Sequence, residues 1–386
     1  MSFIPYGRQD ISQEDIDAVV DILRSDFLTQ GPTVYKFEQC LAEYCGAKYA
    51  VAVNSATSAL HIACLALDVG INDTVWTSPI TFVASANSAL YCGADVDFVD
   101  IDFETNNISV SSLKEKLEDA KKSNSLPSVV IPVHMGGTSC DMEAIYELSK
   151  EYGFRIIEDA SHAIGGEYNN IKVGASPYSD ITVFSFHPVK IITTGEGGAA
   201  LTNNKQLFEK LELFRTHGIT RDTDKMTHES EGGWYYQQIE LGFNYRITDL
   251  QAALGISQMS RIDSFVSKRN KLAERYDENL SNLPLALPKT PNNTYSSYHL
   301  YIIKINEKSK VGRKELFDFL RDNNIGVNVH YIPVHLQPYY KKRGFSEGDF
   351  PEAERFYKKA ISLPLHPQLT LKEQDFVINK ISELLK

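Results

Sequence analysis

From about residue 50 the chain alternates short apolar runs with segments of helical period. Strands are predicted at 49–53, 73–78, 96–99, 128–133, 154–157, 181–186 and 199–202, and helices at 58–67, 82–92 and 142–152. Nearly continuous apolar strands separated by helices indicate an α/β fold with a mostly parallel sheet covered on both faces. Ligands bind such sheets at the carboxyl ends of the strands, so the side chains that follow strands are the candidates for function.

The pattern changes in the last third of the chain. A single long helix is predicted at 248–280 as a connector, followed by strands at 299–305 and 326–330 and helices at 313–323, 352–361 and 372–385. Because 386 residues exceed what one compact domain usually holds, two domains are predicted. Residues 1–255 would form the large α/β domain, and residues 256–386 the connector and a smaller α+β domain.

Charge and cysteine content narrow the class of protein. The formal charge of −11 is spread along the chain without a basic block, so nucleic acid is not expected as a partner. The five cysteines form no CxxC pair and have no histidines at metal-ligand spacing, which predicts no metal site, no disulfide framework and a reducing cytoplasm. No apolar run reaches the roughly 18 residues of a membrane span, so a membrane is not expected as a partner either.

Lys190 lies just past the predicted strand at 181–186 and is followed by two threonines and a glycine turn. A lysine amine ordinarily has a pKa of about 10.4, so a Schiff-base role needs surroundings that favour its neutral form, as burial would. The alternative is an ordinary solvated loop lysine.

Asp159 ends another predicted strand and is followed by small residues and His162. A carboxylate in this place can keep a pyridine nitrogen protonated, which lets the ring accept electrons. Asp159 could instead cap the next helix. His162 could contact a phenolic oxygen of a cofactor or be a satisfied buried histidine.

The segment NSATSAL at 54–60 joins a strand to a helix with small and hydroxylic residues. Its free backbone N–H groups, the helix dipole and the hydroxyls of Thr57 and Ser58 could hold a phosphate, although helix capping alone would also explain the composition. Phe82 follows a further strand, where an aromatic ring could stack on a planar ligand or pack in the core.

Several of these segments together resemble a known family. LTQG at 28–31, NSATSAL at 54–60, DASH at 159–162, SFHPVK at 185–190, TTGEGG at 193–198 and NYR at 244–246 are similar to those of the DegT/DnrJ/EryC1/StrS sugar aminotransferases. The resemblance implies a fold-type I aminotransferase that depends on pyridoxal 5'-phosphate (PLP), with pyridoxamine phosphate as the intermediate form.

The resemblance also assigns roles to residues. It implies that Lys190 carries PLP as a Schiff base and moves protons, that Asp159 pairs with the ring nitrogen, and that His162 lies near the phenolic oxygen. Further cofactor contacts are implied for Ala56, Thr57, Phe82, Ser185 and Asn244. Asn244 would come from the neighbouring subunit, which implies a homodimer with shared sites. The implied substrate contacts are Tyr6, Leu28, Thr29, Gln30, Gly31, Ala56, His187, His330, Tyr331, Ile332 and Pro333.

Within this family the resemblance is to the pseudaminic acid branch. It implies transfer of an amino group from L-glutamate, which leaves 2-oxoglutarate, to C4 of a UDP-linked 4-keto-6-deoxy-N-acetylhexosamine. Alternatives are another nucleotide 4-keto sugar, giving a D-configured 4-amino sugar or 4-amino-4-deoxy-arabinose, a PLP-dependent sugar dehydratase, and a binding protein without turnover. Lys190 argues against the dehydratases, which carry a histidine in its place. The polar and aromatic insertion at 220–240 leaves the sugar open, because it could reshape the sugar pocket or be a surface loop.

Overall fold

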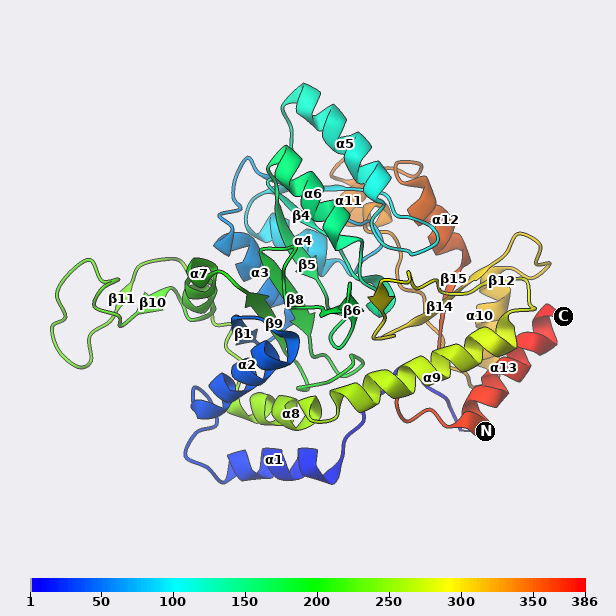
Figure 1. Ribbon diagram of the computed structural model, residues 1–386, viewed down its shortest axis with the longest axis horizontal. Helices are drawn as coiled ribbons and strands as arrows, with labels where there is room; N and C mark the ends of the chain where they lie inside the picture. The colour runs from blue at the N-terminus through cyan, green and yellow to red at the C-terminus, as the bar shows by residue number, and fades with distance from the viewer. Residues whose placement is uncertain (1) are drawn as a thin grey trace.

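A central seven-stranded sheet organises the protein, whose computed structural model describes residues 2–386 (Figure 1). The strand order is β1-β9-β8-β5-β4-β2-β3. All neighbours from β3 to β8 pair in parallel, whereas β9 is antiparallel to both β8 and β1. The predicted α/β fold with a mostly parallel sheet is therefore confirmed. The strands are β1 (Tyr49–Val53), β2 (Thr74–Thr77), β3 (Asp95–Phe98), β4 (Val129–Ile131), β5 (Arg155–Asp159), β8 (Ile181–Ser185) and β9 (Gly198–Thr202).

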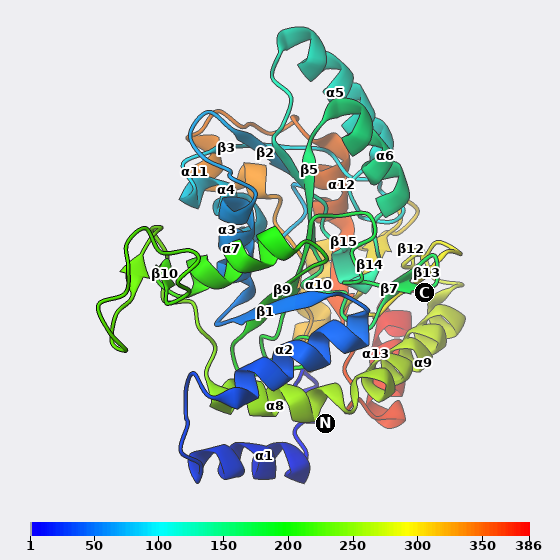
Figure 2. The same ribbon diagram turned by 60° about the vertical axis from the view of Figure 1, so that its left-hand side comes forward.

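Helices cover both faces of this sheet because alternate strand residues are apolar on both sides. In β1, Val51 and Val53 join the apolar cluster on one face, and Ala50 and Ala52 join the cluster on the other. The first face is covered by α3 (Ala56–Ala66), α4 (Ala84–Tyr91) and α7 (Lys205–Arg215). The second is covered by α2 (Pro32–Cys45), α5 (Val110–Ser123), α6 (Met142–Tyr152) and α8 (Asp249–Met259). The N-terminal helix α1 (Gln13–Leu23) packs on α8, which packs on α2 (Figure 2).

A second apolar core lies in the C-terminal part of the chain. It combines residues between Leu272 and Leu385 with Ile4 from the N-terminal segment. The elements here are β12 (Leu285–Ala286), β14 (Tyr301–Ile305), β15 (Ala360–Leu363), α9 (Ile262–Leu280), α10 (Arg313–Asp322) and α13 (Leu371–Leu385). In contrast, α12 (Pro351–Lys359) packs Ala353 and Phe356 into the core of the large sheet. The predicted boundary between residues 255 and 256 falls inside α8, and the division into two domains stays a prediction.

The predicted helix at 248–280 is wrong in one respect, because it is two helices. The helix is interrupted at Ser260 and Arg261, which lie between α8 and α9. Ser260 Oγ donates to the carbonyl of Ser257 at 2.6 Å, and the Arg261 guanidinium is held by Asp10 at 2.9 Å and Asp15 at 2.5 Å. These side-chain contacts anchor the junction to the N-terminal segment.

Two other predicted elements in the C-terminal part differ. Residues 326–330 form no strand, and only isolated bridges join Ile325 to Ile4 and Asn328 to Ser362. The Asn328 side chain accepts the Val329 N–H at 2.8 Å, a local bond that competes with strand pairing. The predicted helix at 352–361 ends at Lys359, and the four buried residues after it pair with β14 as β15.

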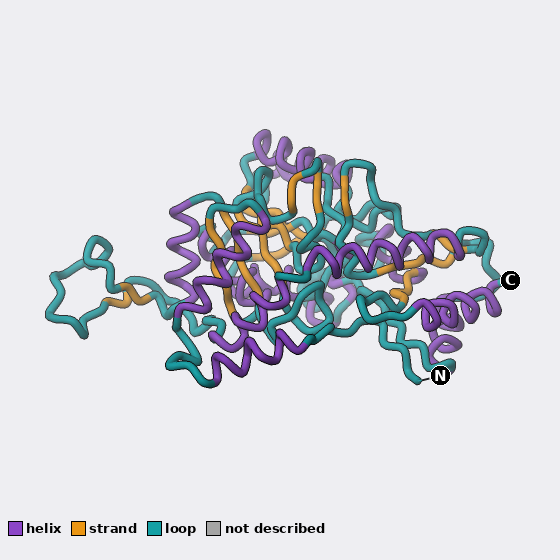
Figure 3. Tube along the Cα trace, turned by 60° about the horizontal axis from the view of Figure 1, so that its bottom comes forward, coloured by secondary structure: helices purple, strands orange, loops and turns teal. Residues whose placement is uncertain are grey.

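The 220–240 insertion forms an arm that projects from the body (Figures 1 and 3). Its base is the two-stranded ribbon of β10 (Ile219–Thr220) and β11 (Gln237–Gln238). Trp234 in the arm is 73% exposed. The remaining elements are β6 (Glu167–Tyr168), β7 (Ile171–Lys172), β13 (Thr294–Tyr295), α11 (Pro338–Lys341) and two short 3-10 turns, η1 (Met135–Gly137) and η2 (Val334–Leu336). Across residues 2–386, none of the helices has the length and apolar character needed to cross a membrane.

Candidate active site

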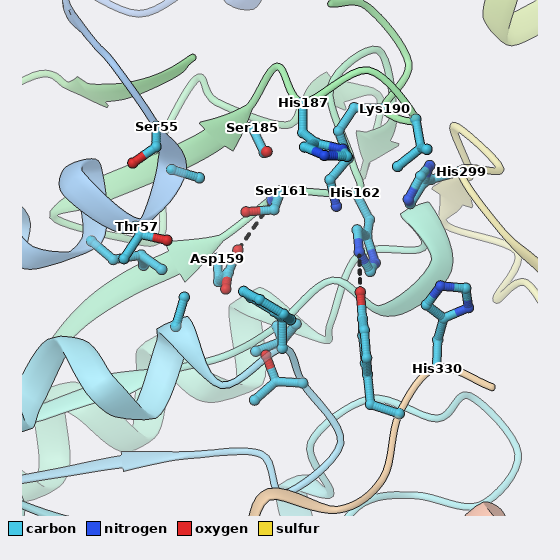
Figure 4. Close-up of a pocket in the computed structure, with 18 of the residues that line it drawn as sticks. Ser55, Thr57, Asp159, Ser161, His162, Ser185, His187, Lys190, His299 and His330 are labelled. Atoms are coloured by element: carbon cyan, nitrogen blue, oxygen red, sulfur yellow. Dashed lines mark hydrogen bonds between the residues drawn. The ribbon is translucent and has the colours of Figure 1, made fainter. Parts of the chain in front are cut away.

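A pocket of about 860 Å³ opens at the carboxyl ends of β1, β5 and β8 (Figure 4). This volume lies within the range of small-molecule and cofactor sites. Eleven of the residues predicted from the sequence line it. They are Tyr6, Ala56, Thr57, Phe82, Asp159, His162, Ser185, His187, Lys190, His330 and Tyr331, and Ser58, the second hydroxyl of the predicted phosphate turn, lines it as well.

The other predicted residues lie outside the pocket of their own chain. Thr29 pairs with Thr248 and Asn244 with Thr216 in isolated backbone bridges. Asn244 is exposed, and Ile332 is 46% exposed. Leu28, Gln30, Gly31 and Pro333 are not among the pocket-lining residues of the described chain either. The roles suggested for these residues stay predictions.

Lys190 lies in the loop after β8, on the wall of the pocket. Its backbone N–H donates to the His187 carbonyl at 2.9 Å, which fixes the turn. Burial lowers the pKa of the Lys190 amine to about 8, although the Asp159 carboxylate opposes the shift. A larger fraction of this amine is therefore neutral near pH 7 than in a solvated lysine, and the neutral amine is the nucleophilic form.

Asp159 ends β5 and points into the same pocket (Figure 4). The Ser161 N–H donates to Oδ1 at 3.1 Å, and the Ser85 hydroxyl donates to Oδ2 at 2.6 Å. Asp159 is 5% exposed. No lysine, arginine or histidine within the described residues forms an ion pair with it. A buried carboxylate facing a cavity is suited to bind a protonated ring nitrogen.

His162 is held in one tautomer by its neighbours. The Gly136 N–H donates to Nδ1 at 3.3 Å, so Nε2 carries the proton and donates to the Tyr331 hydroxyl at 3.2 Å. Burial lowers the pKa of His162 well below its ordinary value, and the Lys190 charge adds to this effect. A neutral imidazole with a fixed N–H can therefore serve as a hydrogen-bond donor at the pocket wall.

The turn before α3 forms one end of the pocket. Ser55 caps the helix by accepting the Ser58 N–H at 3.1 Å, and the first N–H groups of the helix have no intrahelical partners. Gly198 packs against this turn so closely that a Cβ there would lie 2.5 Å from the Ala56 nitrogen. The hydroxyls of Ser55, Thr57 and Ser185 lie around this end (Figure 4).

The C-terminal part closes the opposite side of the pocket. His330 Nδ1 lies 2.8 Å from Ser362 Oγ, and burial lowers the pKa of His330 to about 3. The ring of His299 lies 4.5 Å from that of His162, and burial lowers its pKa well below the ordinary value. Neither histidine therefore carries charge near neutral pH.

Several pocket residues were not predicted from the sequence. His299, Ser55, Ser161 and Gln251 line the pocket, and Ser85 contacts it through Asp159. Ser55 and Ser161 lie inside predicted motifs, so their position beside Thr57 and Asp159 was a usable signal. His299 and Gln251 stand alone in the sequence, and only the tertiary fold brings them to the site.

A model of one protein family matches residues 9–382 of the chain, and its description is the DegT/DnrJ/EryC1/StrS aminotransferase family. The chain belongs to this family. It is 41% identical over 385 residues to the UDP-4-amino-4,6-dideoxy-N-acetyl-beta-L-altrosamine transaminase of Campylobacter jejuni subsp. jejuni serotype O:23/36 (strain 81-176), covering 99% of this chain and 98% of that protein.

Two solved structures of sugar aminotransferases have the same fold. Helicobacter pylori PseC, described as an aminotransferase involved in the biosynthesis of pseudoaminic acid, superimposes with a TM-score of 0.89 at 32% identity, covering 100% of this chain and 99% of that chain. The PLP form of the putative sugar aminotransferase Spr1654 from Streptococcus pneumoniae gives a TM-score of 0.88 at 29% identity, with 100% coverage of both chains.

These findings confirm the predicted family, the aminotransferase activity and the PLP cofactor. The pocket fits this cofactor, because it offers a lysine amine, a buried carboxylate and a hydroxyl-lined helix N-terminus around one cavity. Within residues 2–386 no cluster of histidine, cysteine, aspartate or glutamate has the arrangement of a metal site.

Proposed function

We propose that this aminotransferase moves an amino group from L-glutamate to C4 of a UDP-linked 4-keto-6-deoxy-N-acetylhexosamine. The observation that carries the proposal is the convergence of Lys190, Asp159 and the turn before α3 on one pocket, from three separate segments between residues 54 and 190. The names of the Campylobacter relative and of PseC support the sugar and the position of the new amine.

Each residue then has a defined task. When bound, the cofactor supplies an aromatic ring that accepts the electrons released as a proton leaves the amino donor. Lys190 Nζ holds the cofactor, removes that proton from the donor and later delivers a proton to the sugar carbon. Asp159 would keep the ring nitrogen protonated, and His162 would lie near the phenolic oxygen.

The phosphate of the cofactor would be bound by the N–H groups of Ala56 and Thr57 and by the hydroxyls of Thr57 and Ser185. Phe82 would contact the ring. Asn244 is exposed and outside its own pocket. We therefore propose that it completes the phosphate site of a second subunit in a homodimer.

The sugar nucleotide would lie between the remaining pocket residues. Tyr6, Ala56, His187, His330 and Tyr331 line the part of the pocket that is open to it. Leu28–Gly31, Ile332 and Pro333 lie outside the pocket of their own chain and are proposed as contacts in the assembled enzyme. Location in the cytoplasm, where UDP-sugars are made, remains part of the proposal.

The test is a panel of UDP- and dTDP-linked 4-keto sugars incubated with enzyme and L-glutamate. We expect the UDP-linked 4-keto-6-deoxy-N-acetylhexosamine of L-configuration to gain an amine at C4, with the configuration read by NMR. Lys190→Ala should abolish both turnover and the visible absorbance of the lysine-bound cofactor, whereas Lys205→Ala, at an exposed lysine in α7, should change neither.

Turnover of none of the 4-keto hexoses would contradict the substrate assignment. Preference for a sugar that yields a D-configured 4-amino product would replace it with that alternative. Full activity in Lys190→Ala would overturn the catalytic role assigned to Lys190.

A further inference from the structure

A chain of two buried hydroxyls ends on the carboxylate of Asp159. Thr81 Oγ1 lies 2.7 Å from Ser85 Oγ, and Ser85 Oγ lies 2.6 Å from Asp159 Oδ2. Thr81 lines the pocket but is 1% exposed, and Ser85 is fully buried. Thr81 lies in the segment that joins β2 to α4, and Ser85 lies in the first turn of α4; both are far in sequence from Asp159.

The direction of the two hydrogen bonds follows from proton counting. A hydroxyl carries one hydrogen, and an ionised carboxylate only accepts. Ser85 therefore donates to Asp159, which leaves the Ser85 oxygen to accept from Thr81. The resulting chain runs from Thr81 through Ser85 to the carboxylate, and every donor in it points toward the negative charge.

The bond to Ser85 has two effects on the carboxylate. A hydrogen bond to a charged acceptor is stronger than one between neutral groups, so the Ser85 hydroxyl holds the carboxylate firmly. With the Ser161 N–H on Oδ1 and the Ser85 hydroxyl on Oδ2, the plane of the carboxylate is also fixed from both sides. One lone pair of each oxygen remains for a ligand in the pocket.

We propose that Ser85, supported by Thr81, is a positioning residue that holds the Asp159 carboxylate in the orientation that binds the ring nitrogen of the cofactor. The inference rests on the proposed function of Asp159. Ser85 does not line the pocket, so it acts only through Asp159 and contacts neither cofactor nor substrate.

The test compares PLP with its 1-deaza analogue, in which a carbon replaces the ring nitrogen. Apoenzyme is titrated with each compound, and the ratio of the two dissociation constants gives the preference for the nitrogen. We expect Ser85→Ala to reduce this preference about tenfold, the size of one charge-assisted hydrogen bond, while the affinity for the deaza analogue stays near that of the wild type. If Ser85 only supported the fold, its substitution would weaken the binding of both compounds equally.

Ser88→Ala is the matched control. Ser88 is equally buried on the same helix and donates to the Ser85 carbonyl at 2.8 Å, but it does not contact Asp159. It should keep the wild-type preference. Thr81→Val, which removes the donor to Ser85 at a residue that also lines the pocket, should reduce the preference about threefold and provides a second variant if Ser85→Ala folds poorly.

Asp159→Asn separates the two hypotheses. If wild-type enzyme shows no preference for the nitrogen, or Asp159→Asn retains it, the proposed role of Asp159 is wrong. If Asp159→Asn loses the preference but Ser85→Ala and Thr81→Val keep it, Asp159 stands and the positioning role of Ser85 is overturned. If both hydroxyl variants lost equal affinity for PLP and for the deaza analogue, the positioning role would also be overturned.

Discussion

Lys190 shows how one residue acquires reactivity from its surroundings. Its pKa is lowered to about 8 because the fold removes water from the amine, and the nearby Asp159 charge limits the shift. This balance suits a group that must be neutral to attack and charged to return a proton.

The rate at which apoenzyme captures PLP should therefore depend on pH. Below pH 8 most of the Lys190 amine is protonated and unreactive, so the rate should rise with pH and level off above about 8. Stopped-flow absorbance measures it. With Nα-acetyl-lysine, whose amine has an ordinary pKa of about 10.4, the rate should still be rising at pH 9. If the rate for the protein also keeps rising above pH 9, the pKa of Lys190 is not lowered.

The sequence was sufficient to predict the pocket residues that follow predicted strands. Lys190 and Asp159 could be located because the carboxyl ends of parallel strands meet at one edge of a sheet. Ser85 and His299 could not, because a lone serine or histidine has the same sequence signal in a core, a cap or a site. Their contacts, to Asp159 and to the ring of His162, are made by segments that meet only in the folded chain.

At the scale of elements, the approach of β9 to the start of α3 shapes the end of the pocket that we propose binds the phosphate. Gly198 begins β9, and a Cβ there would lie 2.5 Å from the Ala56 nitrogen and 2.6 Å from the Ser55 carbonyl carbon. Both neighbours are backbone atoms and cannot rotate away. The strand and the helix N-terminus can therefore be this close only with glycine.

Gly198→Ala should push the first turn of α3 away and weaken PLP binding at least tenfold, with a loss of about 1–3 kcal/mol in the free energy of unfolding. Titration of apoenzyme and denaturant unfolding measure the two effects. Gly70→Ala is the control, because a Cβ at Gly70 has no atom within 4 Å. Unchanged affinity in Gly198→Ala would mean that the turn before α3 does not bind the phosphate.

The limits of element prediction have physical causes. The α8–α9 break depends on Arg261 meeting Asp10 and Asp15, which are about 250 residues away in sequence, so no local pattern records it. The segment 360–363 is a short apolar run, which periodicity cannot assign to helix or strand. Only its pairing with β14 makes it a strand.

At the scale of the whole molecule, the pocket of one chain has few positively charged side chains to bind the negative groups of its ligands. Lys190 is the only lysine among the residues that line it, and they include no arginine. The phosphate of PLP, the two phosphates of a nucleotide sugar and the carboxylates of glutamate all need donors. This imbalance supports a site completed by a second subunit.

Mixed dimers test the shared site. If Asn244 serves the neighbouring pocket, a dimer of Lys190→Ala and Asn244→Ala chains has one site with both defects and one native site. Co-expressed chains with different tags should then be more active than either homodimer. Lys190→Ala with Asp159→Asn is the control, because one chain supplies both residues and no native site forms. Equal failure of both pairings would place Asn244 within its own chain's site.

The residues that line the pocket are as far apart in sequence as Tyr6 and Tyr331. During translation the lysine and the acid leave the ribosome long before His299, His330 and Tyr331 do. Because those later residues close one side of the cavity, a nascent chain cannot present a finished cofactor site. Loading with PLP thus belongs to a late stage of biogenesis, after Tyr331 has left the ribosome.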